Sequence, residues 1–314
     1  MVENSIHETP DGSHPDKPAT AFTPLLTTHD WNEEWKELQK ARRAADDASH
    51  WDKRAATFGS KDAPNPYVER FLDLAGIRPG ESVLDMGCGT GALSVPLGAA
   101  GHPVVAADFS QGMLGVLEDE LAERGIVSVT PKLMSWEDDW AAHGVLHGSA
   151  DVAVASRSIA TADLKDSLMR LTDAARRRVC ITLPTGGSPR TDERVLTALG
   201  LQNQLGRDYL YAFAILAEEG LKPEGSYIES ARPDTFDTPE EAYETFSRMV
   251  DDAVGSLVTT AERDAALARL RPWLADNLVE NPRAGLPGRK GEPEKRLALR
   301  EPRKVTWAFI AWDK

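Results

Sequence analysis

Apolar side chains follow two different spacings along this chain, and the change between them divides it into parts. Residues 1–27 are rich in Pro, Ser, Thr, Asp and His and poor in large aliphatic side chains, so we expect a flexible tail. Trp31, Trp35 and Leu38 then recur at helical spacing. Helical patterns cover residues 30–47, 50–58 and 67–75. We therefore expect an N-terminal helical segment over residues 28–75.

Short apolar runs alternate with amphipathic segments between residues 76 and 184. The apolar runs predict strands at 82–86, 103–108, 126–134, 151–156 and 178–184. Helical spacing covers 91–100, 110–125 and 164–175. Strands that alternate with helices predict right-handed βαβ units and a parallel sheet. Pro131 cannot donate a hydrogen bond to a neighbouring strand, so the third strand should lie at a sheet edge.

The spacing changes again beyond Pro184. We expect helices over 190–218, from Pro239 onward and over 260–278, with strands at 226–230 and 304–314. The run Thr238-Pro239-Glu240-Glu241 has the form of a capping box with proline at the first helical position. Residues 76–314 should form the main domain, with 185–300 as a helical insert.

Composition narrows the function classes. The chain has 314 residues, a formal net charge of −14 and 41% hydrophobic residues, which is typical of a globular protein and unlike a general DNA binder. The two cysteines and scattered histidines form no metal-binding pattern, so we expect no metal. No apolar run could span a bilayer and the N-terminus does not resemble a signal peptide. We expect a cytoplasmic protein that does not bind membranes.

The run VLDMGCGTGALS, residues 83–94, places three glycines after a predicted strand. Glycines let the backbone turn tightly and approach a ligand closely. Gly87, Gly89 and Ala92 also satisfy the dinucleotide pattern G-x-G-x-x-G/A, and Asp108 at the end of the next strand could bind ribose hydroxyls in either case. The glycines alone therefore leave two cofactor classes open.

Asp85, two residues before the first glycine, separates these classes. A carboxylate would repel a pyrophosphate, whereas it would attract a cofactor with a cationic amino-acid end and no phosphate. S-adenosylmethionine has an α-ammonium, a sulfonium and a ribose. The run from Val83 to Gly91 resembles the first motif of the class I S-adenosylmethionine-dependent methyltransferases.

Other segments extend this resemblance over residues 50–184. Ala107-Asp108-Phe109-Ser110 with Met113 is similar to the second motif of the family, Met134-Ser135-Trp136 to the third, and 151–158 to the fourth strand and its loop. The helix with Trp51 and Arg54 is similar to the one that lies over the cofactor in small-molecule members, so residues 28–75 would form a lid. The resemblance implies a seven-stranded, doubly wound sheet of order 3-2-1-4-5-7-6 with an antiparallel last strand. It implies these cofactor-binding residues: Asp85, Gly87, Cys88, Gly89, Gly91, Asp108, Phe109, Met113, Ser135, Trp136, Ser156, Trp51 and Arg54.

Several residues keep an alternative role. Asp108 could cap the following helix, Trp136 could pack on the sheet edge, and Trp51 and Arg54 could belong to a docking helix. Cys88 is small and lies inside the loop, which favours packing over nucleophilic chemistry. Ser135 stands at the position where an acidic or small polar residue usually meets adenine in the family, and Glu137 or Asp138 could take that contact instead.

The substrate side is less well defined. Arg157 could orient a substrate carboxylate or phosphate, or pair with Asp163 or Glu137. Ser158 and Tyr209 are further candidates for substrate contact, although Tyr209 shares a helical face that is typical of a core. Arg176-Arg177-Arg178 follows a predicted helix, whose dipole suffices to explain three cations there.

Methyl transfer to a small molecule is thus the predicted activity, with S-adenosyl-L-homocysteine as product and no metal. No residue is assigned as a general base, and neither the acceptor nor the oligomeric state follows from the sequence. One alternative is an RNA methyltransferase that uses residues 282–304, where eight Lys or Arg accompany three acids. A NAD-dependent oxidoreductase and a cofactor-binding protein without transferase activity are the others.

Overall fold

The computed structural model describes residues 25–42, 48–55, 65–202, 206–254, 258–288 and 292–314. Residues 1–30 form a unit of their own, in which the short helix α1 (Leu25–Thr28) is described. Residues 31–314 form the second unit. The predicted tail therefore lies almost entirely outside the described residues, and everything below concerns the second unit. Among the described residues no helix is long and apolar enough to cross a membrane.

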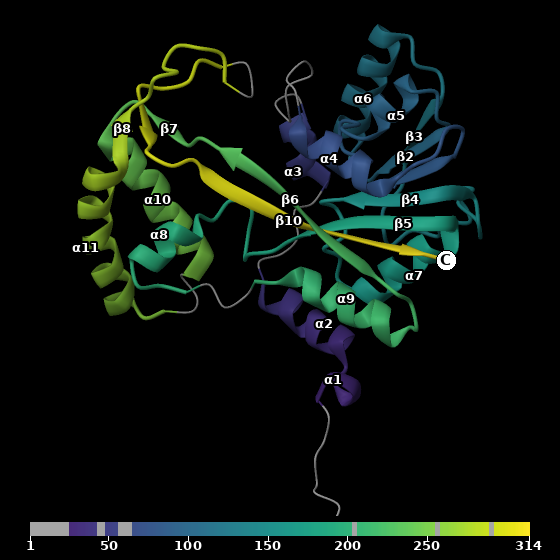
Figure 1. Cartoon of the computed structure of the whole chain (residues 1–314), viewed down its shortest axis with the longest axis horizontal. Helices are drawn as coiled ribbons and strands as arrows, with labels where there is room; N and C mark the ends of the chain where they lie inside the picture. Colours follow the sequence, from purple (N-terminus) through teal and green to yellow (C-terminus); the bar gives the residue numbers. More distant parts are fainter. Residues whose placement is uncertain (1–24, 43–47, 56–64, 203–205, 255–257, 289–291) are drawn as a thin grey trace, which may run out of the picture. The chain divides into compact units, whose positions relative to one another are not determined.

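A seven-stranded sheet organises the second unit (Figure 1). Its order is β3-β2-β1-β4-β5-β10-β6, which is the predicted 3-2-1-4-5-7-6 when the strands of this sheet alone are numbered. The strands are β1 (Val83–Met86), β2 (Val104–Asp108), β3 (Val129–Leu133), β4 (Ala150–Ser156), β5 (Ala175–Pro184), β6 (Glu224–Arg232) and β10 (Arg303–Asp313). The first five pair in parallel, and β10 is antiparallel to both β5 and β6. The predicted fold is confirmed, and Pro131 lies in the edge strand β3 as expected.

Helices cover both faces of the sheet because its inner strands are apolar on both sides. One face packs against α4 (Pro66–Ala75), α5 (Ser94–Ala99) and α6 (Gln111–Arg124), and the other against α2 (Trp31–Ala41), α7 (Leu164–Ala174) and α9 (Asp208–Glu218). The alternation of β10 illustrates this division. Trp307 and Phe309 belong to the core under α4, whereas Ile310 and Trp312 belong to the core with α7 and α9.

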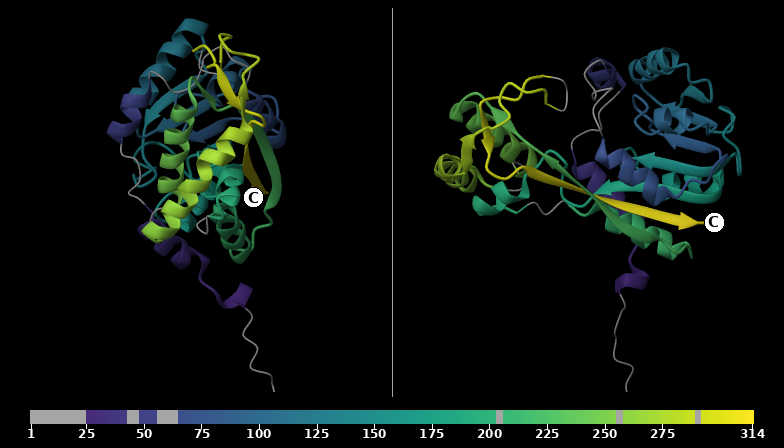
Figure 2. Two further views of the ribbon diagram at one scale, coloured as in Figure 1. Left: turned by 90° about the vertical axis from the view of Figure 1, so that its left-hand side faces the viewer. Right: turned by 45° about the horizontal axis from the view of Figure 1, so that its top comes forward.

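A smaller antiparallel sheet, β7-β9-β8, forms a second layer with three helices near the start of β10 (Figure 2). These elements are β7 (Thr235–Phe236), β8 (Leu278–Glu280), β9 (Leu297–Leu299), α8 (Glu193–Ala198), α10 (Pro239–Val254) and α11 (Thr260–Asn277). They share their own core, which includes Phe236, Phe246 and Leu270. The segment 185–300 thus contains this layer. It also contributes the strand β6 to the main sheet and the helix α9 to one of its faces.

The helices of residues 31–75 pack in three different places. α2 contacts α7 and α9, α3 (Ala48–Ala55) contacts α6, and α4 contacts β6 and β10. The indole of Trp35 in α2 donates to the carbonyl of Thr161 at 2.8 Å, which ties that helix to the loop after β4. Among the described residues of this segment, α3 is the helix that lies against α6.

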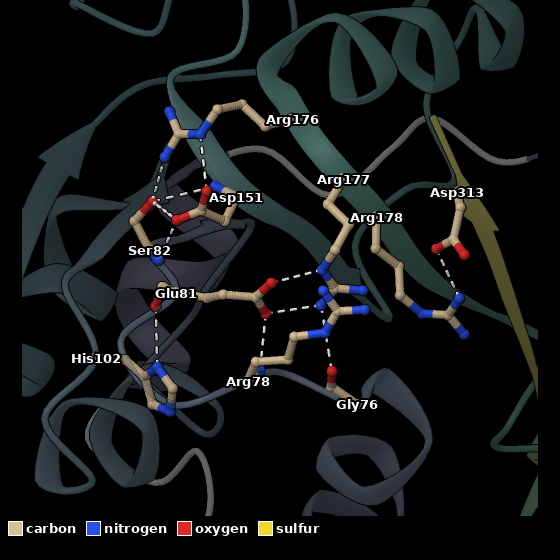
Figure 3. Close-up of polar contacts among 10 residues, drawn as sticks. All are labelled: Gly76, Arg78, Glu81, Ser82, His102, Asp151, Arg176, Arg177, Arg178 and Asp313. Atoms are coloured by element: carbon tan, nitrogen blue, oxygen red, sulfur yellow. Dashed lines mark hydrogen bonds and ion pairs between the residues drawn. The ribbon is translucent and has the colours of Figure 1, made fainter.

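The arginine run lies at the edge where the parallel strands begin (Figure 3). Arg176 bonds to Asp151 at 2.8 Å, Arg177 makes two bonds to Glu81, and Arg178 bonds to Asp313 at 2.9 Å. These arginines belong to β5, which begins at Ala175 directly after α7. Ion pairs to acids on neighbouring segments therefore explain the run better than the helix dipole that the sequence indicated.

Candidate functional site

The glycine loop begins where β1 ends, at the carboxyl edge of the parallel strands. Gly87, Gly89 and Gly91 have φ of 73°, 56° and 85°, a conformation that side chains with a Cβ rarely adopt. The amides of Gly87 and Cys88 both donate to the carbonyl of Ala107, at 2.8 and 2.9 Å. These bonds hold the loop against the end of β2, so the first two strands present their carboxyl ends together.

Asp85 is buried in β1, directly before the loop. Its side chain is 1% exposed, and Oδ2 accepts a hydrogen bond from Ser94 Oγ at 2.6 Å. Burial raises the pKa of this carboxyl to about 6, against the lowering effect of the Ser94 hydrogen bonds. No cation among the described residues contacts it. A positively charged ligand group near this carboxylate would therefore be stabilised strongly.

Asp108 ends β2 on the other side of the loop. Its carboxylate accepts from the amide of Gly89 at 2.8 Å and from the amide of Ser110 at 2.9 Å. Burial raises its pKa, and the backbone hydrogen bonds oppose that effect. Ser110 caps α6, since its Oγ accepts from the amide of Met113 at 3.1 Å. The alternative in which Asp108 caps this helix is therefore wrong.

Phe109 and Met113, which follow Asp108, differ in exposure, and Ser135, which follows β3, is held by local hydrogen bonds. The Phe109 ring is 37% exposed, although large apolar side chains around it are mostly buried, whereas Met113 is 2% exposed. The amide of Ser135 donates to Asp138 Oδ2 at 2.8 Å, and its hydroxyl accepts from the amide of Glu137 at 3.2 Å.

The third-motif tryptophan has an aromatic neighbour. The Trp136 ring lies 5.6 Å from the Trp140 ring and packs at the margin of the core. Packing of Trp136 is thus present, and it leaves the predicted adenine contact untested.

The side chain of Asp52 fastens the helix α3 to the start of α6. Asp52 Oδ1 accepts from Ser110 Oγ at 2.6 Å and from the amide of Gly112 at 2.9 Å. A Cβ on Gly112 would lie 2.9 Å from Asp52 Cα, so only glycine permits this approach. Trp51 is half-buried in the same helix, and the side chain of Arg54 lies outside the described part of the chain.

The turn after β4 packs directly on the glycine loop. Ser158 Oγ donates to the carbonyl of Met86 at 2.7 Å, and a Cβ on Gly87 would lie only 2.2 Å from Ser158 Cβ. Ser156, at the end of β4, shares a hydrogen bond of 2.8 Å with the hydroxyl of Tyr67. The predicted cofactor and substrate residues at 85–91 and 156–158 are therefore brought together, as the order of β1 and β4 requires.

Arg157 contacts two aromatic residues that have no distinctive pattern in the sequence. Its guanidinium lies over the Tyr67 ring, 4.4 Å from the centroid, and 5.9 Å from the centroid of Trp307. Asp163, a proposed partner of Arg157, instead forms an ion pair with Lys36 at 3.0 Å. Tyr67 and Trp307 lie at apolar positions of an ordinary helix and strand, so no local signal could have identified them.

Tyr209 lies away from the turn after β4, and Cys88 is not suited to act as a nucleophile. Tyr209 packs edge-on against Tyr227 of β6, with ring centroids 6.3 Å apart, at the far end of the sheet order from β1. No described contact joins it to Arg157. Burial raises the pKa of the Cys88 thiol well above its usual value, which agrees with packing and not with a nucleophile.

The basic segment 282–304 is partly neutralised. Arg283 pairs with Glu294 at 2.9 Å, and Arg303 bonds to Asp234 at 3.0 Å. Lys295 pairs with Glu241. Three of the cations in the described part of this segment are therefore paired with acids within the protein.

Comparisons with known proteins agree with this geometry. Residues 83–178 match the family model described as "Methyltransferase domain". An uncharacterized protein of Haemophilus influenzae is 32% identical over 209 residues, which cover 66% of this chain and 75% of that protein. Nocamycin O-methyltransferase of Saccharothrix syringae is 39% identical over 98 residues, and this match spans only 30% of this chain and 34% of the relative.

One solved structure is also similar to part of this chain. The YcgJ protein of Bacillus subtilis aligns with 79% of this chain and 97% of its own, at 12% identity and a TM-score of 0.48. The strand order, the glycine loop, the matched domain and the long alignment with the Haemophilus protein lead to one assignment. The chain belongs to the class I S-adenosylmethionine-dependent methyltransferases.

Proposed function

We propose that the glycine loop and its two acids hold S-adenosylmethionine, and that the methyl group passes to a small-molecule acceptor bound beside the 156–158 turn. One observation carries this proposal. Two buried carboxylates, Asp85 and Asp108, flank a loop of left-handed glycines at the carboxyl ends of adjacent strands. A phosphate-bearing cofactor would be repelled at this position, whereas a cationic one without phosphates would be attracted.

The residues present fit the cofactor in three respects. Asp108 accepts two hydrogen bonds now, and a carboxylate in that position can accept equally from two ribose hydroxyls. The exposed Phe109 ring next to it offers an apolar surface for adenine. Asp85 supplies negative charge on the side of the amino-acid end.

The remaining cofactor residues are carried by the family resemblance. Gly87, Gly89 and Gly91 give backbone access and Cys88 fills space behind the loop. Ser156 lies on the acceptor side. Further contacts from the lid side and from the loop after β3 remain part of the proposal: Trp51, Arg54, Met113, Ser135 and Trp136. The lid role is kept for α3 alone, because Asp52 fastens that helix next to Ser110.

The cofactor supplies an activated methyl group on a sulfonium, so the protein needs only to orient the acceptor and exclude water. Placement of an acceptor atom at near-attack distance can contribute roughly 7–11 kcal/mol to lowering the barrier. The 156–158 turn is suited to this placement because Ser158 contacts Gly87 directly. No described side chain at the turn is assigned as a base.

A small-molecule acceptor is supported by the aromatic and cationic surroundings of the turn and by the internal pairing of segment 282–304. The name of the nocamycin relative agrees with an acceptor of this kind. A cavity of about 150 Å³ just beyond β5, lined by Pro184, Thr306 and Lys304 among others, is too small to hold a typical ligand alone. It would accommodate only part of an acceptor.

The binding of S-adenosylhomocysteine tests the cofactor assignment. Asp108→Ala should weaken binding in calorimetry by more than the ~1 kcal/mol of an ordinary hydrogen bond, hence by more than about fivefold. Asp119→Ala is the matched control, since this acid is exposed on α6 and away from the loop. Equal affinities of the two variants would refute the proposed site.

A further inference from the structure

Arg157 has a strained backbone that its neighbours maintain. Its φ is 62°, in the left-handed region that residues other than glycine seldom occupy. Its amide donates to Thr182 Oγ1 at 3.0 Å, and this hydroxyl also bonds to the Tyr67 hydroxyl at 2.7 Å. Strained residues of this kind gather at binding sites, where the surrounding structure holds a side chain in one position.

The Arg157 guanidinium has no acid partner among the described residues. The arginines in Figure 3 contrast with it, because each of the three in the run at 176–178 bonds to a carboxylate. Arg157 instead lies over the Tyr67 ring. A guanidinium over an aromatic ring keeps its N–H donors at its rim, and these remain available for an anion.

Trp307 adds a second unused donor. Its side chain is 6% exposed, and within the described segments its Nε1 has no hydrogen-bond partner. A buried N–H without a partner is costly and needs an explanation. The Trp307 ring lies beside both Tyr67, at 6.2 Å between centroids, and the Arg157 guanidinium.

The position of Tyr67 is fixed by two hydrogen bonds of its hydroxyl. Its hydroxyl is held between Ser156 and Thr182, so the ring cannot turn away from Arg157 without loss of both bonds. Tyr67 is also the second residue of α4, whose N-terminal dipole adds positive potential on the same side. The Arg157 guanidinium, the N-terminal dipole of α4 and the Trp307 N–H would thus all favour a bound anion.

We propose that Tyr67, Arg157 and Trp307, hereafter the Arg157 cluster, bind a carboxylate or phosphate group of the methyl acceptor. The Arg157 guanidinium would donate to two oxygens of the anion, and the Trp307 N–H would donate a third hydrogen bond to the same anion. This inference rests on the proposed function, since Arg157 acts here as a residue for acceptor binding. It adds that the acceptor is an anion and that aromatic rings flank its charged group.

The arrangement also explains why the turn is built as it is. Ser158 packs on Gly87 and Ser156 holds Tyr67, so residues on both sides of Arg157 are anchored to rigid parts of the site. An anion held by Arg157 would therefore lie at a constant position relative to the glycine loop. Orientation of the acceptor is what methyl transfer requires of the protein.

Two anionic probes test the proposal in the full-length protein saturated with S-adenosylhomocysteine. Benzoate and phenyl phosphate represent the two sources of an oxyanion, and benzamide is the neutral control. Binding is measured by calorimetry and by the indole N–H signals in ¹H–¹⁵N spectra, with the Trp307 signal assigned through Trp307→Phe. We expect at least one anion to bind at least tenfold more tightly than benzamide and to shift the Trp307 signal.

Variants separate this site from the cofactor site. Arg157→Gln should reduce anion affinity at least tenfold while S-adenosylhomocysteine affinity stays within twofold, and Arg157→Lys should give an intermediate loss. Arg248→Gln, on the exposed face of α10, should change neither affinity. Thermal melts of each variant show that loss of binding is not loss of folding.

The outcomes are distinct. Equal binding of anions and benzamide, or no shift of the Trp307 signal, overturns the anion site. A tenfold loss of S-adenosylhomocysteine affinity in Arg157→Gln also overturns it, because Arg157 would then hold the carboxylate of the cofactor. Failure of the wild-type protein to bind S-adenosylhomocysteine would instead refute the cofactor site under Proposed function.

Discussion

The contact between the glycine loop and the turn after β4 gives the sharpest prediction. In Gly87→Ala the new Cβ would lie 2.2 Å from Ser158 Cβ and 2.6 Å from Ser158 Oγ, which is far inside van der Waals contact. The residue would also keep a φ of 73°, which costs roughly 1–2 kcal/mol for a side chain with a Cβ. Overpacking adds about 1–3 kcal/mol. We expect a total loss of about 2–5 kcal/mol in the free energy of unfolding.

Gly220→Ala is the matched control for this substitution. Gly220 has a φ of 78°, and a Cβ there would meet nothing within 4 Å. It lies after α9, away from the glycine loop. The control should therefore lose only the backbone part, about 1–2 kcal/mol, and should bind S-adenosylhomocysteine as the wild type does.

Urea unfolding and calorimetry measure the two effects. Gly87→Ala should lose more stability than the control and at least tenfold in S-adenosylhomocysteine affinity, because Ser158 must move with its bond to Met86. Addition of Ser158→Gly should restore the packing part and reveal a coupling between the two sites. Equal losses in Gly87→Ala and Gly220→Ala would refute the contact between the loop and the turn.

The remaining predictions concern three acids. Asp52→Ala should cost about 1 kcal/mol at the start of α6 and speed hydrogen exchange of the Gly112 amide, and unchanged exchange would contradict the docking of α3. Glu81→Gln should lower the free energy of unfolding at pH 7 by about 1.5–3 kcal/mol, because two hydrogen bonds from Arg177 lower the pKa of Glu81. This contribution is present above the unfolded-state pKa and disappears as pH falls through the lower folded value, so the two proteins should converge in urea unfolding below about pH 4. Asp85 behaves in the opposite sense: burial raises its folded pKa to about 6, so ionisation destabilises the ligand-free protein as pH rises from about 4 to above 6. Asp85→Asn should remove this decline in the free energy of unfolding, measured by unfolding curves over a series of pH values. The same decline in the variant would show that ionisation of Asp85 is not its cause.

The local pattern of the chain was sufficient to predict the proposed cofactor half of the site. The period of apolar residues predicts the alternating strands and helices, and right-handed crossovers then leave few possible sheet orders. Asp85, Gly87 and Asp108 could be identified because they lie within one βαβ unit, where short connections determine their proximity. The last strand was placed by family resemblance, since periodicity alone cannot say which strands pair.

The proposed acceptor side depends on contacts between distant segments. Tyr67, Arg157 and Trp307 meet because β10 pairs antiparallel with β5 and brings Trp307 opposite Pro184, while α4 lies across the same face. Arg157 is a candidate from the sequence because it follows a predicted strand, whereas Tyr67 and Trp307 have ordinary local environments. None of the three indicates its partners.

The same reasoning applies to the charged segments. Arg176-Arg177-Arg178 and the cations of 282–304 are recognised in the sequence as positive runs, but their effect depends on which acids lie within reach. Asp151, Glu81 and Asp313 come from three different strand ends or loops, and only the folded sheet brings them to one edge. The period, the fold class and the proposed cofactor loop could thus be predicted from the sequence, because they depend on neighbours along the chain. Which charges are neutralised, and which, like that of Arg157, have no acid partner among the described residues, follows only from the folded chain, because electrostatic pairing depends on distance in space.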